Sequence, residues 1–258
     1  MNEREYALMR QMEDVHWWYV ALREFAAAEL ESQLAHEPEA GILDAGCGTG
    51  GMMEVLRRRR PSWRLHGLDF FAEALEHTRR RGFADLIQGS VNSLPFADAS
   101  LDAVISLDVL YFEGVDDRKS LEEVHRVLKP GGCLILNLPA YHCLRGQHDV
   151  AVRGVRRYTP KLVRDLLTHS RLDFMRVHCW NLWLFFPILC WRTLSRMRQP
   201  VDPALTRSDL AMPPAPLNAV LTFLARQDMK LCRAICSPLG TSVFAVAKKK
   251  SHDVEPHS

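Results

Sequence analysis

The sequence has almost no net charge. Its 33 lysines and arginines are balanced by 31 aspartates and glutamates, which leaves a formal charge of +2. So small an excess does not favour nucleic acid as a partner, because proteins that bind a phosphate backbone need a strongly positive surface. Basic residues do gather at 57–60 and 79–81, but both runs fall at the C-terminal ends of predicted helices, where cations complement the helix dipole. We interpret both runs as solvated helix faces.

The chain also lacks the cysteine spacing of a metal site and the layout of a targeting segment. The closest two of its seven cysteines, Cys232 and Cys236, stand four residues apart on a predicted helix, so we predict no bound metal. Unpaired thiols are typical of a reducing compartment, and residues 1–6 lack the charged-then-apolar order of a signal peptide. We therefore expect a cytoplasmic protein.

The most informative segment is 42–51, where two apolar residues run into Asp44 and then into a series of glycines. This order predicts a strand, a tight turn and a helix that begins near Met52. Glycine has no Cβ and adopts positive φ without strain, so it lets backbone amides press against a ligand at the positive end of the helix. We therefore expect a carboxylate or phosphate group to lie on this turn.

The glycine spacing alone leaves two ligand classes open. Gly46, Gly48 and Gly51 also fit the dinucleotide fingerprint G-x-G-x-x-G. Asp44 favours the other class, because an anion beside the turn repels a pyrophosphate and attracts a cationic amine. S-adenosylmethionine (SAM) presents an amine, a carboxylate and a ribose together. A second predicted strand ends at Asp69, whose carboxylate can accept hydrogen bonds from the ribose hydroxyls of either ligand.

Five segments, taken in order, resemble the class I SAM-dependent methyltransferases and favour SAM over a dinucleotide. These segments are 44–50, 67–71, 89–96, 101–110 and 122–132. The resemblance implies that SAM is the cofactor. It also implies a set of cofactor-binding residues, namely Asp44, Gly46, Gly48, Gly50, Asp69, Phe70, Ser90, Val91 and Leu107.

Each of these residues has an implied role. The glycines line the methionine part of SAM, Asp44 lies near its amino group, and Asp69 holds the ribose hydroxyls. Phe70 lies against the adenine face, Ser90 and the following valine reach the adenine edge, and Leu107 with the next residue offers a carbonyl to the methionine end. Many relatives have an aspartate in place of Ser90. A serine hydroxyl accepts a hydrogen bond without charge assistance, so we expect weaker adenine binding or a substitute group.

The alternation of predicted strands and helices indicates an α/β fold with a doubly wound, seven-stranded, mostly parallel sheet. We place the strands near 41–45, 64–68, 85–88, 101–106, 132–138, 174–180 and 241–247. The resemblance implies a Rossmann-like methyltransferase fold in which the seventh strand inserts antiparallel between the fifth and the sixth. We predict one domain over 1–250, made of an N-terminal lid helix (1–38), a SAM-binding core (39–140), an acceptor-side loop, helix and strand (141–180) and an apolar helical insertion (181–240), with a polar tail at 251–258.

The N-terminal segment 3–35 is predicted to be a helix with an aromatic cluster at 17–19. The cluster resembles the lid helices that close over cofactor and acceptor in these methyltransferases, although core packing also explains it. We consider His16 a candidate for contact with the acceptor, against the more usual structural role of a lone helical histidine.

The loop after the fifth strand is the second region expected at the acceptor. Loops at the carboxyl ends of parallel strands border the ligand crevice, which places His142, His148 and Asp149 near the transferred methyl. His148 can act as a general base near neutral pH, or it can bond a loop carbonyl. Arg156 and Arg157 either pair at the surface or bind an anionic group of the acceptor.

The third region is the apolar stretch 182–191, which arginines follow at 192, 196 and 198. It is too short to cross a bilayer, which takes about 20 residues. Three interpretations remain open: a cover over the acceptor pocket, a homodimer surface, or a peripheral membrane anchor with its arginines at lipid headgroups. All three imply an apolar neighbour.

The sequence therefore predicts a methyltransferase that moves the methyl of SAM to an oxygen, carbon or nitrogen of a hydrophobic small molecule or lipid-like acceptor. One alternative is a protein of the same fold that binds SAM without turnover. A dinucleotide-binding oxidoreductase is the other.

Overall fold

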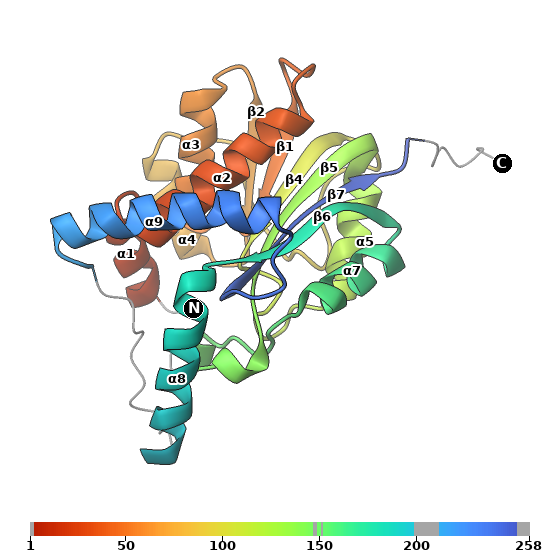
Figure 1. The fold of residues 1–258 in the computed structure, drawn as a ribbon. Coiled ribbons are helices and arrows are strands. Elements are labelled where there is room, and N and C mark those ends of the chain that lie inside the picture. Colours follow the sequence, from red (N-terminus) through yellow and green to blue (C-terminus); the bar gives the residue numbers. More distant parts are fainter. Residues whose placement is uncertain (1–2, 147–148, 151, 199–211, 252–258) are drawn as a thin grey trace.

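The computed structural model describes residues 3–146, 149–150, 152–198 and 212–251. Its centre is a seven-stranded sheet in the order β3-β2-β1-β4-β5-β7-β6 (Figure 1). The strands are β1 (Gly41–Ala45), β2 (Arg64–Asp69), β3 (Leu86–Gln88), β4 (Leu101–Leu107), β5 (Leu128–Pro139), β6 (Leu172–Trp180) and β7 (Ser242–Lys249). All neighbours are parallel except β7, which is antiparallel to both β5 and β6. The predicted fold class is confirmed.

Helices cover both faces of the sheet. They are α1 (Glu3–Met12), α2 (Trp17–Gln33), α3 (Gly51–Arg59), α4 (Ala72–Arg80), α5 (Asp117–Val127), α7 (Pro160–His169), α8 (Leu182–Arg198) and α9 (Ala215–Ala234), with a 3-10 turn η1 (His142–Leu144). Residues of α2, α3 and α9 pack on one face, and residues of α5 and α7 pack on the other. This is the doubly wound arrangement that the alternating pattern predicts.

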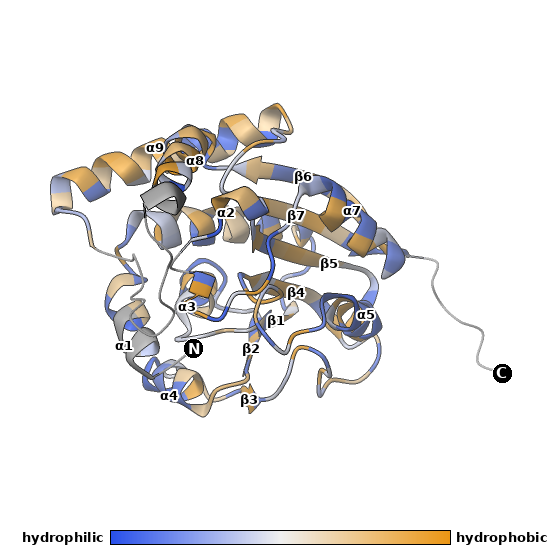
Figure 2. Ribbon diagram, turned by 90° about the horizontal axis from the view of Figure 1, so that it is seen from below, coloured by the Kyte–Doolittle hydropathy of each residue, from blue (hydrophilic) through white to orange (hydrophobic). Residues whose placement is uncertain are grey.

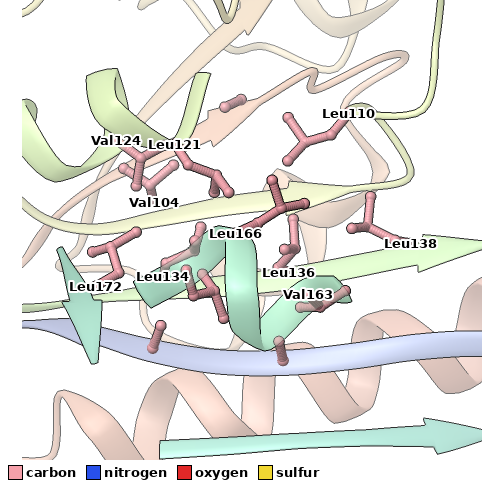
Figure 3. Close-up of a cluster of buried hydrophobic side chains, with 14 of the residues drawn as sticks. Val104, Leu110, Leu121, Val124, Leu134, Leu136, Leu138, Val163, Leu166 and Leu172 are labelled. Carbon is pink, nitrogen blue, oxygen red and sulfur yellow. The ribbon is translucent and has the colours of Figure 1, made fainter. Parts of the chain in front are cut away.

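The core is divided by the pleat of the strands. Because successive side chains of a strand point to opposite faces, Ile42 packs with α2 and α3 while Leu43 packs on the side of α5 and α7. The central strands consist largely of hydrophobic residues (Figure 2), and these residues divide between the clusters on the two faces. Figure 3 shows the cluster on the side of α5 and α7. There, side chains of the strands lie among side chains of these two helices. The strand residues are Val104, Leu134 and Leu136, and the helix residues are Leu121, Val124, Val163 and Leu166. Burial on both faces explains why these strands are almost continuous apolar runs.

The N-terminal segment forms two helices and not the single helix predicted over 3–35. The chain turns at 13–16, where the fully buried carboxylate of Glu13 accepts hydrogen bonds from Arg23, Arg81 and Thr49. His16 then begins α2, because its Nδ1 accepts a hydrogen bond from the backbone N–H two residues later (3.3 Å). A second expectation is also wrong. The side chain of Arg81 is only 6 % exposed and paired, so the run 79–81 is not wholly a solvated face.

The helical insertion between β6 and β7 consists of α8 and α9. α9 lies along α2, and α8 extends away from the sheet in Figure 1. Asp228 of α9 accepts a hydrogen bond from the N–H of Leu182 (3.0 Å), which fixes the start of α8. Within the described residues, none of the helices combines the length and apolar character that crossing a bilayer requires.

Candidate functional site

A pocket of about 990 Å³ lies at the carboxyl ends of β1, β2 and β4. Each of these strands brings one acid to it: Asp44 within β1, Asp69 at the end of β2 and Asp108 directly after β4. In an open parallel sheet, the crevice beyond the carboxyl ends of the strands is the usual ligand site.

The predicted cofactor-binding residues converge on this pocket, with one exception. The pocket is lined by Asp44, Gly46, Gly48, Asp69, Phe70, Ser90, Val91 and Leu107. Gly50 does not line it. That residue begins α3 in a left-handed conformation (φ 81°), and a Cβ there would lie 2.8 Å from the Cγ2 of Thr78. Gly50 therefore shapes the turn from the side that faces away from the cavity.

The turn is held by hydrogen bonds within the protein. The N–H groups of Gly46 and Cys47 donate to the carbonyl of Leu68 (2.7 and 2.9 Å), and the N–H of Gly48 donates to Oδ2 of Asp69 (2.9 Å). These three amides are therefore engaged within the protein, and the expectation that an anionic ligand group lies on this turn stays a prediction. Gly46 and Gly48 have positive φ (90° and 55°), so glycine is required for the shape of the turn.

Asp44 lies buried in the wall of the pocket. It is 3 % exposed, and its Oδ2 has no hydrogen-bond partner among the described residues. Burial raises the pKa of Asp44 to about 7, while Arg23 acts in the opposite direction. A buried carboxylate without a partner is costly, so a cationic group in the pocket would be stabilised beside it. The amino group of SAM meets this requirement, and a pyrophosphate does not.

Asp69 presents its carboxylate one strand away. Besides the Gly48 amide, it accepts hydrogen bonds at Oδ1 from the N–H of Phe71 (3.1 Å) and from the hydroxyl of Tyr6 (3.4 Å). Burial raises the pKa of Asp69, and these hydrogen bonds offset part of that rise. Because Tyr6 belongs to α1, the N-terminal helix lies over the carboxylate predicted to hold the ribose.

The residues predicted to meet the adenine lie at the same end. Phe70 is 65 % exposed, Val91 is buried, and both line the pocket. The hydroxyl of Ser90 accepts a hydrogen bond from the N–H of Asn92 (3.2 Å) and so supports its own turn. An exposed aromatic ring in a pocket offers a flat apolar surface for a base.

Residues at the start of α2 and residues of α8 also line the pocket. His16 lines the pocket as predicted, and its ring lies against Trp17 (5.6 Å between centroids) and Tyr19 (5.9 Å). Burial lowers the pKa of His16, which keeps the imidazole neutral near pH 7. α8 contributes Ile188 and Arg192 to the same wall.

The loop after β5 only partly matches its predicted arrangement. His148 lies outside the described residues, and His142 is exposed and does not line the pocket, so the placement of His142 near the methyl is wrong. Asp149 lines the pocket and forms a two-point ion pair with Arg157 (2.8 and 3.0 Å). Arg156 pairs with a carboxylate of α5 (3.3 Å). Both arginines are thus paired within the chain.

Residues 43–136 match the model of a family described as a methyltransferase domain. The ubiquinone/menaquinone biosynthesis C-methyltransferase of Desulfotalea psychrophila is 37% identical over 52% of this chain and 52% of its own length. A malonyl-[acyl-carrier protein] O-methyltransferase of Coxiella burnetii is 31% identical over 50% of this chain and 46% of its own. Residues 43–136 therefore form a class I SAM-dependent methyltransferase domain. The chain spans about half the length of these curated relatives.

Solved methyltransferase structures share the fold over most of the chain. A sarcosine dimethylglycine methyltransferase candidate from Galdieria sulphuraria has a TM-score of 0.63 at 19% identity, over 96% of this chain and 98% of that chain. The geranyl diphosphate C-methyltransferase of Streptomyces coelicolor has a TM-score of 0.57 at 18% identity, over 86% and 78%. Identities this low show the fold alone. The predicted family and its cofactor, SAM, are confirmed by the domain match.

The methyltransferase domain also contains a pocket residue that the sequence reasoning did not use. The resemblance implies only a backbone role for Asp108, yet this residue lines the pocket and its carboxylate accepts hydrogen bonds from the side-chain amide of Asn137 (2.9 and 3.1 Å). The signal was present, because Asp108 follows a predicted strand just as Asp69 ends one. Among the described residues, no group of His, Cys, Asp and Glu side chains is arranged to hold a metal ion.

Proposed function

We propose that this methyltransferase transfers the methyl of SAM to a hydrophobic small molecule. The observation that carries the proposal is that one pocket holds both the predicted cofactor-binding residues and an apolar, aromatic wall. That wall includes Trp17, Trp18, Tyr111, Phe112, Leu144 and Ile188. A cavity of this kind, mostly apolar with a few polar groups, is the usual form of a small-molecule site.

In this proposal residues 39–140 bind SAM, and the acceptor is held by 1–38 together with the segments after 140. Asp44 binds the amino group, Asp69 the ribose hydroxyls and Phe70 the adenine face. The glycine turn lies along the methionine part, Ser90 and Val91 meet the adenine edge, and Leu107 offers its carbonyl. SAM supplies an activated methyl group when bound. The chain's own contribution is to align the acceptor with that methyl and to exclude water.

The acceptor atom is an oxygen, a carbon or a nitrogen. Relatives of this chain are named as a C-methyltransferase and as an O-methyltransferase, so family membership leaves the atom open. His16 is a candidate for contact with the acceptor because it lines the pocket, and His148 stays a predicted general base. A cytoplasmic location likewise stays a prediction.

For α8 we propose a cover over the acceptor. Ile188 and Arg192 line the pocket, and the ring of Trp183 lies 6.0 Å from that of Trp17 on α2. The helix also exposes apolar side chains, since Phe186 and Trp191 are 58 % and 64 % exposed. These exposed side chains keep the two other uses of 182–191 open, as a homodimer surface or as a peripheral membrane contact.

The proposal is tested in two steps. Titration calorimetry with SAM and with its demethylated product, S-adenosylhomocysteine, measures the cofactor half of the pocket. Incubation with SAM labelled in the methyl group and a panel of hydrophobic acceptors then measures transfer into the organic phase. Binding without transfer to any acceptor would favour a SAM-binding scaffold. Transfer only to protein or RNA would contradict the small-molecule acceptor.

A further inference from the structure

Asp108 lines the pocket that holds both the predicted cofactor-binding residues and the aromatic wall. It follows the last residue of β4, and β4 is paired with β1, which leads into the glycine turn. The next residue, Val109, packs against that turn so closely that a Cβ on Gly46 would lie 2.3 Å from its Cγ2. On the other side the pocket wall continues through Tyr111 and Phe112. Asp108 therefore stands in the chain between a residue that packs on the glycine turn and residues of the aromatic wall, and it lines the same pocket.

The backbone of Asp108 is held in an unusual conformation. Its φ is 57°, in the left-handed region that costs a side-chain-bearing residue free energy, although aspartate tolerates it better than most. Its N–H donates to the carbonyl of Asn137 (2.8 Å), which fixes the turn after β4. Such strain is retained where surrounding structure enforces it, and it is common at functional sites.

A chain of buried hydrogen bonds orients the carboxylate. The indole N–H of Trp180 donates to Oδ1 of Asn137 (2.8 Å), and both residues are fully buried. An indole nitrogen only donates, so the amide oxygen of Asn137 must face Trp180 and its NH₂ must face Asp108. That NH₂ donates to both carboxylate oxygens, at 3.1 and 2.9 Å. A carboxylate has about four acceptor positions, so positions remain for a further donor.

No ion pair to Asp108 occurs within the described part of the chain. Arg157 is the charged group that acts on it, and Arg157 is already bound at two points to Asp149. The other titratable group facing it is the Tyr111 hydroxyl, whose own pKa is raised by burial and by Asp108. Burial raises the pKa of Asp108 to about 7, with Asn137 and Arg157 acting against this rise. Asp108 retains some accessible surface and lines the pocket, so a ligand can reach it.

We propose that Asp108 is the catalytic residue that receives the acceptor's proton, and that the acceptor is a flat apolar molecule whose nucleophile is a hydroxyl group. The inference rests on the proposed function. The O–H bond of the acceptor breaks and its proton passes to the carboxylate of Asp108. The oxygen forms a bond to the methyl carbon while the bond from that carbon to sulfur breaks. The electron pair of that bond stays on sulfur, so a neutral thioether, a methyl ether and a neutral carboxylic acid result.

The test variant is Asp108→Asn. Its side chain keeps the shape of aspartate and can still accept a hydrogen bond from Asn137, but it cannot take up a proton. The matched control is Asp102→Asn. Asp102 lies at the opposite end of β4, where it binds Lys129 and the N–H of Gly41. His148→Gln tests the competing base. Thermal melting confirms that each variant is folded before it is used.

The first experiment measures binding without turnover. With S-adenosylhomocysteine present at pH 8, calorimetry compares 1-naphthol with 1-methoxynaphthalene, which lacks the hydroxyl proton. We expect the wild type and Asp102→Asn to prefer the naphthol by about tenfold or more, the effect of a hydrogen bond to a charged group. Asp108→Asn should lose this preference and keep its affinity for S-adenosylhomocysteine. Equal preference in Asp108→Asn and wild type, or no naphthol binding by wild type, overturns the inference.

The second experiment measures turnover against pH with hydroxylated aromatic acceptors. We expect the wild-type rate to rise as Asp108 loses its proton through about pH 7, and Asp108→Asn to be slower by about 10²-fold or more with unchanged SAM affinity. A slow His148→Gln beside a normal Asp108→Asn would overturn the inference and leave the proposed function intact. Methylation of only those acceptors that lack a hydroxyl group would also overturn the inference and leave the proposed function intact. Failure of the wild type to methylate any acceptor would count against the proposed function, and the naphthol comparison would still decide the role of Asp108.

Discussion

The hydroxyl of Tyr6 donates a hydrogen bond to Oδ1 of Asp69 (3.4 Å), although the two residues are 63 positions apart in sequence. Asp69 also accepts from two backbone N–H groups, so three of its roughly four acceptor positions are occupied. The two hydroxyls of a ribose need more acceptor positions than the one that remains on Asp69. If Asp69 holds the ribose as proposed, Tyr6 has to release Asp69 when SAM binds.

Replacement of Tyr6 by Phe should raise the affinity for SAM by up to about fivefold, because a hydrogen bond worth about 1 kcal/mol no longer has to be broken. Titration calorimetry measures the change. Tyr141→Phe is the control, since that hydroxyl donates to the carbonyl of Pro238, away from Asp69. Weaker SAM binding by Tyr6→Phe would mean that the hydroxyl contacts the ligand directly.

Asp69→Ala should weaken SAM binding by about 1.5 to 3 kcal/mol, the range for losing hydrogen bonds to a charged group. Asp102→Ala removes the same group from the far end of β4 and should leave the affinity of the folded protein unchanged. Calorimetry on both variants, each checked for folding by circular dichroism, makes the comparison. An unaltered Kd for Asp69→Ala would remove this residue from the site.

SAM affinity should increase with pH between about 6 and 8, because the pKa of Asp44 lies at about 7 and the deprotonated carboxylate attracts the amino group. Asp44→Asn should bind SAM more weakly at pH 8 and show a flatter pH profile. Calorimetry at several pH values makes the test. If Asp44→Asn retains the wild-type dependence, another group controls it.

The same pKa predicts a stability difference. Burial raises the pKa of Asp44 above that of the unfolded chain, so the folded protein holds the proton more tightly. That stabilisation is complete below about pH 4 and is lost as pH rises through about 7. The free energy of unfolding of Asp44→Asn, measured in urea relative to wild type, should therefore increase over this window. A constant difference between pH 4 and 8 would contradict the raised pKa.

Gly48→Ala should reduce SAM affinity more than it reduces stability. The new Cβ would lie 2.8 Å from the Cε of Met9, the movable end of a side chain, but it would also enter the pocket. Gly82→Ala is the matched control, because it imposes the same kind of positive-φ strain, about 1 to 2 kcal/mol, at a glycine (φ 86°) outside the pocket. Equal SAM affinity in the two variants would show that Gly48 matters for the backbone alone.

The cover proposed for α8 is tested by two substitutions on one helix. Ile188→Ala should raise the KM for the acceptor by about tenfold or more with SAM affinity unchanged, because Ile188 lines the pocket. Phe186→Ala should leave that KM unaltered, since Phe186 is 58 % exposed. Loss of liposome binding in Phe186→Ala would identify a membrane contact. Conversion of a dimer to a monomer on gel filtration would identify a dimer surface.

Much of the cofactor half could be predicted from the sequence, because its chemistry is carried by local patterns. An apolar run that ends in an acid locates Asp44 and Asp69 without knowledge of the rest of the chain. The same rule predicts the third acid of the pocket, because Asp108 directly follows the apolar run of β4. Local sequence therefore contains the information for all three acids.

Other features depend on contacts between distant parts of the chain. The break between α1 and α2 has no glycine or proline to announce it. It exists because Glu13 is buried against Arg81, 68 residues away, and against Arg23. The hydrogen bonds that engage the amides of Gly46 and Cys47 likewise need β2 to be in place. A single sequence contains no local sign of such pairings.

The position of β7 has a consequence for the order in which the pocket is completed. This strand lies between β5 and β6 but follows both in the chain, and its first residue, Ser242, pairs with Pro139 on one side and Trp180 on the other. Ser242 also lines the pocket. The three acids of the pocket, Asp44, Asp69 and Asp108, all precede residue 109. During synthesis the predicted cofactor-binding residues therefore emerge from the ribosome long before β7, which adds Ser242 to the pocket wall. A growing chain can thus acquire a place for its cofactor while it still has no complete place for an acceptor.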